Sequence, residues 1–204
     1  MAKIVFFDID TQFDFIDPKG KLYVKGSEAI VKNLKLLTEF AESRKIKIIS
    51  TVDAHSLTDP ELKSWPPHCI KGTDGQKKIP ETLIDGNVII GSQKDIEAIK
   101  DLINYPQVIL EKSVLNVFDE SYSDSFIKSL SIGHFVVYGV ATEYCVREEG
   151  LGLLKRGYKV TVVEDAIKPI SEKAGKATLE EFRKLGASFA KTSQIIDPES
   201  RILS

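Results

Sequence analysis

Short apolar runs alternate along the chain with longer stretches in which apolar residues recur every three or four positions. The short runs, rich in valine and isoleucine, are typical of buried strands, and the longer stretches are typical of amphipathic helices. The predicted strands are Lys3–Asp8, Ile46–Val52, Asn87–Ile90, Gln107–Glu111, His134–Gly139, Lys159–Glu164 and Ser188–Lys191. The predicted helices are Ser27–Ser43, Asp95–Asn104, Ser121–Leu130, Glu143–Lys155 and Ser171–Leu185.

This alternation predicts an α/β fold, because strands joined through helices form right-handed crossovers and therefore parallel pairs. We expect a three-layer, Rossmann-like sandwich in which a mainly parallel central sheet is flanked by helices. The chain has 204 residues, which is long for one small domain and short for two. A single domain spanning residues 1–204 is therefore expected.

One segment breaks the pattern. Residues Asp53–Lys78 carry prolines and glycines without a clear period, together with two of the three histidines and the only tryptophan. Connections longer than about 12–15 residues are uncommon in compact domains and are usually functional when ordered. This segment is therefore expected to belong to a functional site.

The composition limits the partners and the compartment. A net charge of -2 argues against a broad surface for nucleic acid or for anionic membranes. No apolar run approaches the ~20 residues that span a bilayer, and the first residues do not resemble a signal peptide. Cys69 and Cys145 are the only cysteines. A reduced, cytoplasmic protein without a structural disulfide is the expectation, and the sequence is compatible with a homo-oligomer.

The stretch FFDIDTQFDF, from Phe6 to Phe15, allows two interpretations. Asp8-Ile9-Asp10 resembles the paired aspartates of haloacid-dehalogenase-type phosphatases, in which the first carboxylate attacks phosphorus. In the second interpretation, Asp10 is a single reactive carboxylate at a strand end, with the aromatic ring of Phe15 five positions further on. The two interpretations require different partners downstream.

Reactive side chains follow four of the predicted strands. Asp10 follows the first, Asp53 and His55 the second, Lys112 the strand Gln107–Glu111, and Cys145 the strand His134–Gly139. Ligands of parallel α/β sheets bind outside the carboxyl ends of the strands. The pattern therefore predicts that these side chains meet at one edge of the sheet.

Cys145 is the candidate nucleophile. It is predicted in the first turn of a helix, where unpaired N–H groups and the helix dipole lower the pKa of a thiol. Lys112 would stabilise the thiolate by Coulomb attraction, and Asp10 would take the thiol proton and deliver it to a leaving amine. Considered alone, a free cysteine is more often a buried structural residue than a nucleophile. A lysine at a strand end, considered alone, is more often solvated than catalytic.

Asp53-x-His55 places two metal-ligand types on one side of an extended segment, and His68 can complete a site with one carboxylate and two histidines. Three protein ligands leave coordination positions open, as in catalytic metal sites. The alternative is a pair of loop histidines bonded to the backbone. Cys69 is expected to be buried rather than to act as a fourth ligand, and we assign no role to His134.

Two aromatic residues are expected near this site. Pro66 and Pro67 stiffen the loop after Trp65, and Phe15 approaches from the end of the first strand. Two rigid aromatic rings on either side of a pocket would suit a flat ring ligand. Two core aromatics beneath a long loop would explain the same residues equally well.

Together these stretches resemble the isochorismatase-like cysteine hydrolases, and within them the nicotinamidases, also called pyrazinamidases. The matching elements run from Asp10 to beyond Asp165. Asp10-x-Gln12-x-Asp14-Phe15, Lys112 and the stretch from Gly139 to Val146 resemble the setting of the Asp–Lys–Cys triad of the superfamily. Asp53-Ala54-His55 and Trp65-Pro66-Pro67-His68-Cys69-Ile70-Lys71-Gly72-Thr73 resemble the metal and substrate-ring segment of nicotinamidases.

The resemblance implies a metal-dependent amidohydrolase that deamidates nicotinamide, a small-molecule amide, to nicotinate and ammonia through a thioester in NAD salvage. It implies Asp10, Lys112 and Cys145 as the triad, and Asp53, His55 and His68 as ligands of one Zn²⁺, Fe²⁺ or Mn²⁺. It further implies that Phe15 and Trp65 sandwich the substrate ring, whose nitrogen approaches the metal. The amides of Ala141 and Cys145 would form the oxyanion hole, with a cis peptide bond at Val140–Ala141.

Two stretches depart from the family pattern. Residues Gln76–Glu111 are longer than usual, and Lys112 is followed by Ser113-Val114-Leu115-Asn116-Val117-Phe118 instead of a serine-rich run. Both departures can reshape the rim of the pocket. An amidase acting on another small amide and a catalytically silent metal-binding scaffold are therefore alternatives. The phosphatase interpretation is the weakest, because Gln12 stands where those enzymes have threonine or valine.

Overall fold

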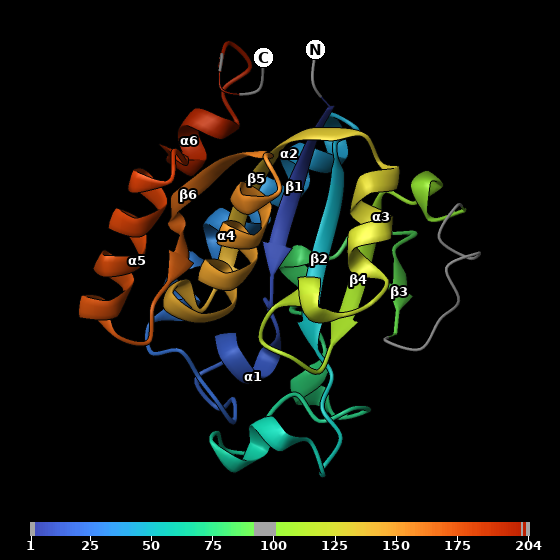
Figure 1. Cartoon of the computed structure of the whole chain (residues 1–204), viewed down its shortest axis with the longest axis vertical. Helices are drawn as coiled ribbons and strands as arrows, with labels where there is room; N and C mark the ends of the chain where they lie inside the picture. Colours follow the sequence, from blue (N-terminus) through green and yellow to red (C-terminus); the bar gives the residue numbers. More distant parts are fainter. Residues whose placement is uncertain (1–2, 92–100, 201, 203–204) are drawn as a thin grey trace.

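Seven parallel strands form one sheet in the computed structural model, which describes residues 3–91, 101–200 and 202 (Figure 1). The spatial order is β3-β4-β2-β1-β5-β6-β7, and every neighbouring pair is parallel. The strands are β1 Lys3–Ile9, β2 Lys47–Asp53, β3 Val88–Ile90, β4 Gln107–Lys112, β5 Ile132–Val140, β6 Lys159–Lys168 and β7 Ser188–Ala190.

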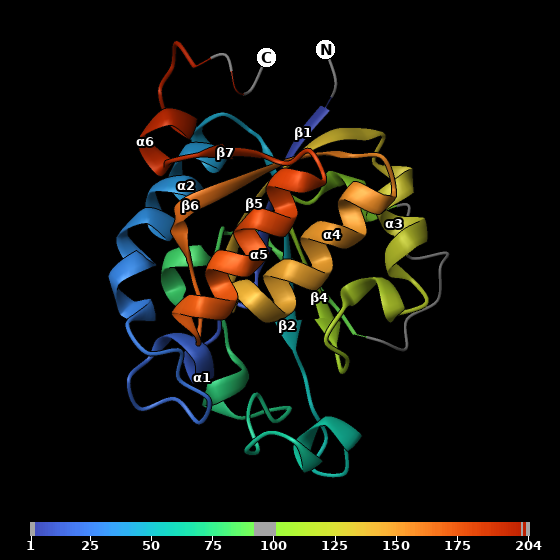
Figure 2. The same ribbon diagram turned by 60° about the vertical axis from the view of Figure 1, so that its left-hand side comes forward.

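Helices cover both faces of this sheet. They are α1 Phe13–Ile16, α2 Val31–Ser43, α3 Ser123–Ser129, α4 Arg147–Lys155, α5 Glu172–Lys184 and α6 Thr192–Ile195. Figure 2 shows α3, α4 and α5 on one face, with α2 and α6 on the other side. The predicted three-layer α/β architecture is confirmed. Among the described residues, no helix is long and apolar enough to cross a membrane.

The differences from the predicted elements have local causes. The predicted helix Ser27–Ser43 begins as a 3₁₀ turn at Ser27–Ile30 before α2, and β6 extends beyond Glu164 to Lys168. The helices α1 and α6 were not predicted, because four residues are too few to show a helical period. The predicted helix Asp95–Asn104 lies largely outside the described residues.

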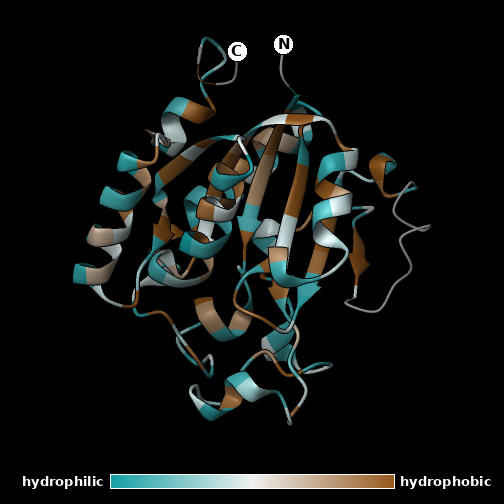
Figure 3. Cartoon of the chain, viewed as in Figure 1, coloured by the Kyte–Doolittle hydropathy of each residue, from teal (hydrophilic) through white to brown (hydrophobic). Residues whose placement is uncertain are grey.

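Apolar side chains of the central strands form the core between the layers. In Figure 3 the central strands are coloured largely as hydrophobic residues. The carboxyl ends of β5 and β1 approach each other closely at Gly139, which has a φ of +123°. A Cβ at this position would lie 2.0 Å from the carbonyl oxygen of Ile9, so only glycine fits. The strands β4, β2, β1 and β5 are consecutive neighbours, and their carboxyl ends form the edge shown at the bottom of Figure 1.

Candidate functional site

Each predicted reactive side chain lies at the carboxyl edge of the sheet. Asp10 follows β1 in a left-handed conformation with a φ of 50°, which aspartate adopts more readily than most residues. Asp53 ends β2 and Lys112 ends β4, and the two residues are paired in register. Cys145 follows β5. Because these four strands are adjacent, side chains that are far apart in the sequence meet here.

Lys112 is the centre of this group and is 1% exposed. Its Nζ lies 2.8 Å from Asp10 Oδ2 and 3.7 Å from Cys145 Sγ, and it donates a hydrogen bond to Asp53 Oδ1. The three residues predicted as a triad are therefore in contact. Burial alone would lower the pKa of Lys112, but the carboxylates of Asp10 and Asp53 raise it well above 10.5, so the side chain is an ammonium.

The prediction of a lowered thiol pKa is wrong for this state of the protein. Burial raises the pKa of the Cys145 thiol well above its ordinary value, and the nearby Asp10 carboxylate adds to this effect more than Lys112 offsets it. Burial also raises the pKa of Asp10, against the attraction of Lys112. The thiol therefore retains its proton, and Asp10 is a stronger base than an exposed aspartate.

The backbone around Cys145 also differs from the prediction. The cysteine lies in a kinked turn, Thr142–Val146, and α4 begins only at Arg147. Tyr144 within this turn has non-helical dihedral angles, with φ −115° and ψ −107°. The cis peptide bond expected at Val140–Ala141 is present directly before the turn.

A second cluster adjoins Lys112 through Asp53. Asp53 Oδ2 lies 3.8 Å from His55 Nε2 and 3.7 Å from His68 Nε2, so the three predicted ligands are together. Glu61 joins them, and one donor atom from each of the four residues lies within 4.8 Å of the others. The sequence did not indicate Glu61, because a glutamate in a polar loop has no distinguishing pattern.

The Nδ1 atom of each of the two histidine rings lies within hydrogen-bond distance of another group. His55 Nδ1 is 3.1 Å from Asp59 Oδ2, and His68 Nδ1 is 2.8 Å from the carbonyl oxygen of Pro66. Both Nε2 atoms are thereby directed at Asp53, and His55 Nε2 is buried without a hydrogen-bond partner among the described residues. Metal-binding histidines are oriented by such outer contacts. The donor set fits a divalent transition metal ion.

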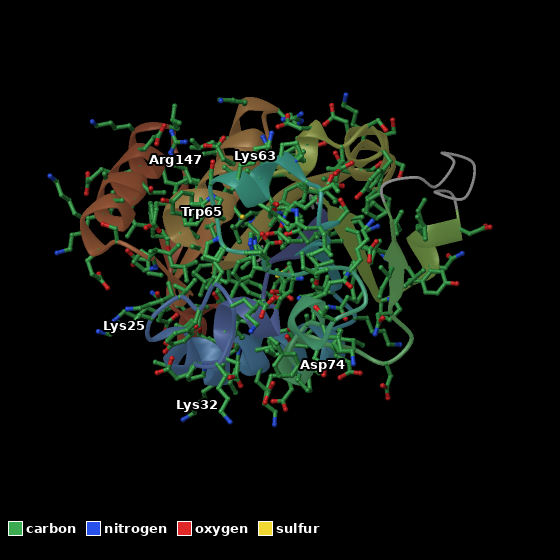
Figure 4. The ribbon with its side chains drawn as sticks, turned by 90° about the horizontal axis from the view of Figure 1, so that it is seen from below. Lys25, Lys32, Lys63, Trp65, Asp74 and Arg147 are labelled. Carbon is green, nitrogen blue, oxygen red and sulfur yellow. The ribbon has the colours of Figure 1, made fainter. Side chains whose placement is uncertain are left out.

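A pocket lies between the two clusters. It is lined by Phe15, Leu22, Val24, Asp53, Glu61, Trp65, His68, Leu115, Ala141, Tyr144, Cys145 and Ile170. Phe15 packs 5.4 Å from the His68 ring, and Trp65 packs edge-on 5.1 Å from Tyr144. Figure 4 views this edge and shows Trp65 and Lys63 on the segment that crosses it. Leu115 belongs to the stretch after Lys112 that departs from the family pattern, and it lines the rim of the pocket.

Two buried residues beneath this pocket were not predicted. Glu149 is fully buried on α4, and its Oε1 lies 4.0 Å from Lys112 Nζ. Thr51 Oγ1 lies 2.8 Å from Asp10 Oδ1 and 3.2 Å from Glu149 Oε2. A glutamate at a helical position does not indicate in the sequence that its side chain points into the core.

The remaining polar residues singled out in the sequence have structural surroundings. Asp8 is paired with Lys78 at 2.7 Å inside the protein, and Asp14 Oδ2 accepts the backbone N–H of Cys69 at 2.7 Å. Cys69 is fully buried and both cysteines are free. His134 Nε2 lies 2.8 Å from Thr161 Oγ1, away from the site.

Comparison with known proteins gives a consistent result. The isochorismatase domain family matches residues 5–194. A nicotinamidase/pyrazinamidase from Mycobacterium tuberculosis is 26% identical over 185 residues, which cover 86% of this chain and 91% of the relative. A probable inactive nicotinamidase from Arabidopsis thaliana is 26% identical over 188 residues, covering 87% of both chains. The crystal structure of the Pyrococcus horikoshii pyrazinamidase in complex with zinc shares the fold, with a TM-score of 0.77 and 23% identity over 93% of this chain and 99% of that one.

Proposed function

This chain belongs to the isochorismatase family, and we propose that it is a metal-dependent cysteine amidohydrolase that converts nicotinamide to nicotinate and ammonia in NAD salvage. One observation carries the proposal: a single pocket is lined by the thiol of Cys145, by Asp53 and His68 of the candidate metal cluster, and by the aromatic rings of Phe15, Trp65 and Tyr144. A flat ring amide can therefore meet the nucleophile and the metal cluster together. We place the whole chain, 1–204, in one cytoplasmic catalytic domain.

Asp10, Lys112 and Cys145 are the proposed catalytic residues. Because the thiol is protonated at rest, Asp10 takes its proton as Sγ forms a bond to the amide carbon. Asp10 then gives this proton to the amide nitrogen, the C–N bond breaks, and ammonia leaves a thioester on Cys145. Water adds to the thioester carbon, the acid departs, and the thiol regains its proton. The ammonium of Lys112 balances the negative charge throughout.

The negative charge that develops on the amide oxygen requires hydrogen-bond donors. We assign this role to the backbone N–H group of Ala141, which belongs to the cis peptide bond, and to that of Cys145, within the turn that follows. Donors of this kind typically contribute about 2.7–4 kcal/mol each to stabilisation of the transition state.

Asp53, His55 and His68 are the proposed metal ligands, and Glu61 is a fourth candidate. Two observations support this assignment: Nε2 of His55 is buried without a hydrogen-bond partner among the residues that the structure describes, and the Pyrococcus horikoshii protein was solved in complex with zinc. When bound, Zn²⁺, Fe²⁺ or Mn²⁺ would supply a Lewis acid. Phe15 and Trp65 would hold the substrate ring, with its nitrogen directed towards the ligand cluster.

The test is release of ammonia and nicotinate from nicotinamide by the metal-loaded protein. Cys145→Ala should abolish release, and Cys69→Ala, which removes the other buried thiol outside the pocket, should retain it. Residual activity of Cys145→Ala within about tenfold of wild type would exclude covalent catalysis by this residue.

Two alternatives have distinct outcomes in the same assay. If nicotinamide is inert but another small amide releases ammonia, the protein is a related amidase, and the rim at Leu115 is the first place to look. If no amide reacts although metal binds, the protein is a silent scaffold, as the match to a probable inactive relative allows. Release of phosphate from a generic phosphate ester would revive the phosphatase interpretation.

A further inference from the structure

Glu149 has no part in the proposed reaction, yet it lies against the residues that do. It is the only glutamate buried among the residues that the structure describes, and it follows Cys145 by four positions. The charged groups that face it are Asp10 from the end of β1, Asp53 from β2 and Lys112 from β4. The protonation state of this carboxyl group therefore contributes to the net charge of the site.

Hydrogen-bond counting limits the forms of the two carboxyl groups that contact Thr51. Thr51 has one hydroxyl proton, but its Oγ1 lies within hydrogen-bond distance of two carboxyl groups, at 2.8 Å from Asp10 Oδ1 and at 3.2 Å from Glu149 Oε2. One hydroxyl cannot donate a full hydrogen bond to both, although it can donate one and accept another. The shorter contact is to Asp10; when Thr51 donates its proton there, its oxygen can form a hydrogen bond with Glu149 only if Glu149 carries a proton.

The surroundings of Glu149 agree with a protonated side chain. Its Oε1 has no hydrogen-bond partner among the described residues and lies 4.0 Å from Lys112 Nζ, whereas Asp10 Oδ2 lies 2.8 Å from the same atom. An unpaired oxygen costs a neutral acid far less than a carboxylate. Burial, with Asp10 adding to it, also raises the pKa of Glu149 well above 4.5.

We propose that Glu149 is a positioning residue that, as a neutral acid, donates its Oε2 proton to Thr51 and thereby commits the Thr51 hydroxyl proton to Asp10 Oδ1. This inference deepens the proposed function and rests on it. The consequence for the reaction concerns the other oxygen of Asp10. Oδ2 lies 2.8 Å from Lys112 Nζ and is not contacted by Thr51, so it is the oxygen that can receive the proton of Cys145.

Infrared spectroscopy tests the neutral acid without any substrate. Protein labelled with ¹³C in the glutamate carboxyl groups should show, at neutral pH, the carbonyl band of a protonated carboxylic acid, shifted by the label. Glu149→Gln should remove this band, and Glu61→Gln should leave it. Absence of the band from wild type, or its survival in Glu149→Gln, would overturn the inference even if nicotinamide proves to be the wrong substrate.

Kinetics test the positioning role. Glu149→Leu keeps the volume but cannot donate, and it should lower kcat at least about tenfold while KM for nicotinamide changes little. Glu149→Gln donates through its amide and should restore kcat to within about threefold of wild type. Equal losses in both variants, or an unchanged kcat in Glu149→Leu, would contradict a neutral donor.

Thr51→Val provides an independent variant in case Glu149→Leu fails to fold. It should lower kcat as Glu149→Leu does, and adding Glu149→Leu to Thr51→Val should cause no further loss, because both changes break the same chain of hydrogen bonds. Additive losses would contradict the relay through Thr51. Circular dichroism and the bound metal content of each variant verify that the fold and the metal cluster persist.

Discussion

The side-chain amide of Gln12 brackets the backbone of Asp53. Its Nε2 donates to the Asp53 carbonyl oxygen at 2.8 Å, and its Oε1 accepts the Asp53 N–H at 2.7 Å. Both residues are buried, so the N–H and the carbonyl group of Asp53 cannot form hydrogen bonds to water instead. This pair fixes the end of β2, and with it the carboxylate that contacts Lys112 and both histidines.

Gln12→Ala should therefore destabilise the protein and weaken metal binding. Leaving a buried donor or acceptor unpaired costs about 1–3 kcal/mol, which a urea titration can measure. Asn87→Ala is a matched control, because Asn87 also donates an amide hydrogen bond to a carbonyl, that of Ile84, away from the site. A loss of stability without any loss of metal affinity in Gln12→Ala would contradict its role in holding Asp53.

The metal cluster predicts one divalent transition metal ion per chain. His55→Ala or His68→Ala should abolish binding, because each removes a directed Nε2 atom, and Glu61→Gln should weaken it. His134→Gln is the control, since His134 is a buried histidine outside the cluster. Elemental analysis and calorimetric titration give the stoichiometry and the affinity.

Cys69→Ser should keep the metal, because the Cys69 thiol does not belong to the cluster of donor atoms. Loss of metal in this variant would identify Cys69 as a ligand. A wild-type protein that binds none of Zn²⁺, Fe²⁺ and Mn²⁺ after purification without chelators would refute the site.

Substrate choice tests the pose in the pocket. Nicotinamide and pyrazinamide should be hydrolysed faster than benzamide, which has the same shape but no ring nitrogen for the metal. The lost contact should cost on the order of 1–3 kcal/mol, or roughly ten- to two-hundred-fold in kcat/KM. Trp65→Ala should weaken all three substrates alike, since stacking does not require the nitrogen. Equal rates on benzamide and nicotinamide would refute the metal-anchored pose.

The buried acid also predicts a pH dependence of stability. The folded-state pKa of Glu149 is raised above its unfolded value, so the unfolded protein binds fewer protons above pH 4.5, and this group favours folding less as pH rises. Glu149→Gln removes that titration. The variant should gain stability relative to wild type between pH 5 and 8, and the difference should disappear near pH 4. Denaturant titrations across this range measure it, and a constant difference would show that Glu149 is ionised in the folded protein.

The strand order explains why part of the site was predictable. Asp10, Asp53, Lys112 and Cys145 each follow an apolar strand, and the carboxyl ends of parallel strands share one edge. The pattern of strands therefore predicted their meeting without the order β4-β2-β1-β5 being known. The fold required only this local information, whereas the place of His68, which lies in the loop after β2, did not follow from it.

The missed residues share a different feature. Thr51, Glu61 and Glu149 contact segments that are distant in the sequence, and their own surroundings in the chain are ordinary. The pKa of Cys145 was predicted in the wrong direction for the same reason. Its value depends on burial and on the position of Asp10, and neither is a property of the local turn.

The sequence by itself determined the parallel α/β architecture, the sheet edge that carries the site, and the chemical types gathered there, because periodicity and strand ends are local properties. Only the tertiary structure decided which groups are buried together, which oxygen of Asp10 faces Thr51 and which faces Lys112, and which acid lies beneath the triad. Desolvation and hydrogen-bond partnership depend on all the neighbours of a group, and most of those neighbours come from other parts of the chain.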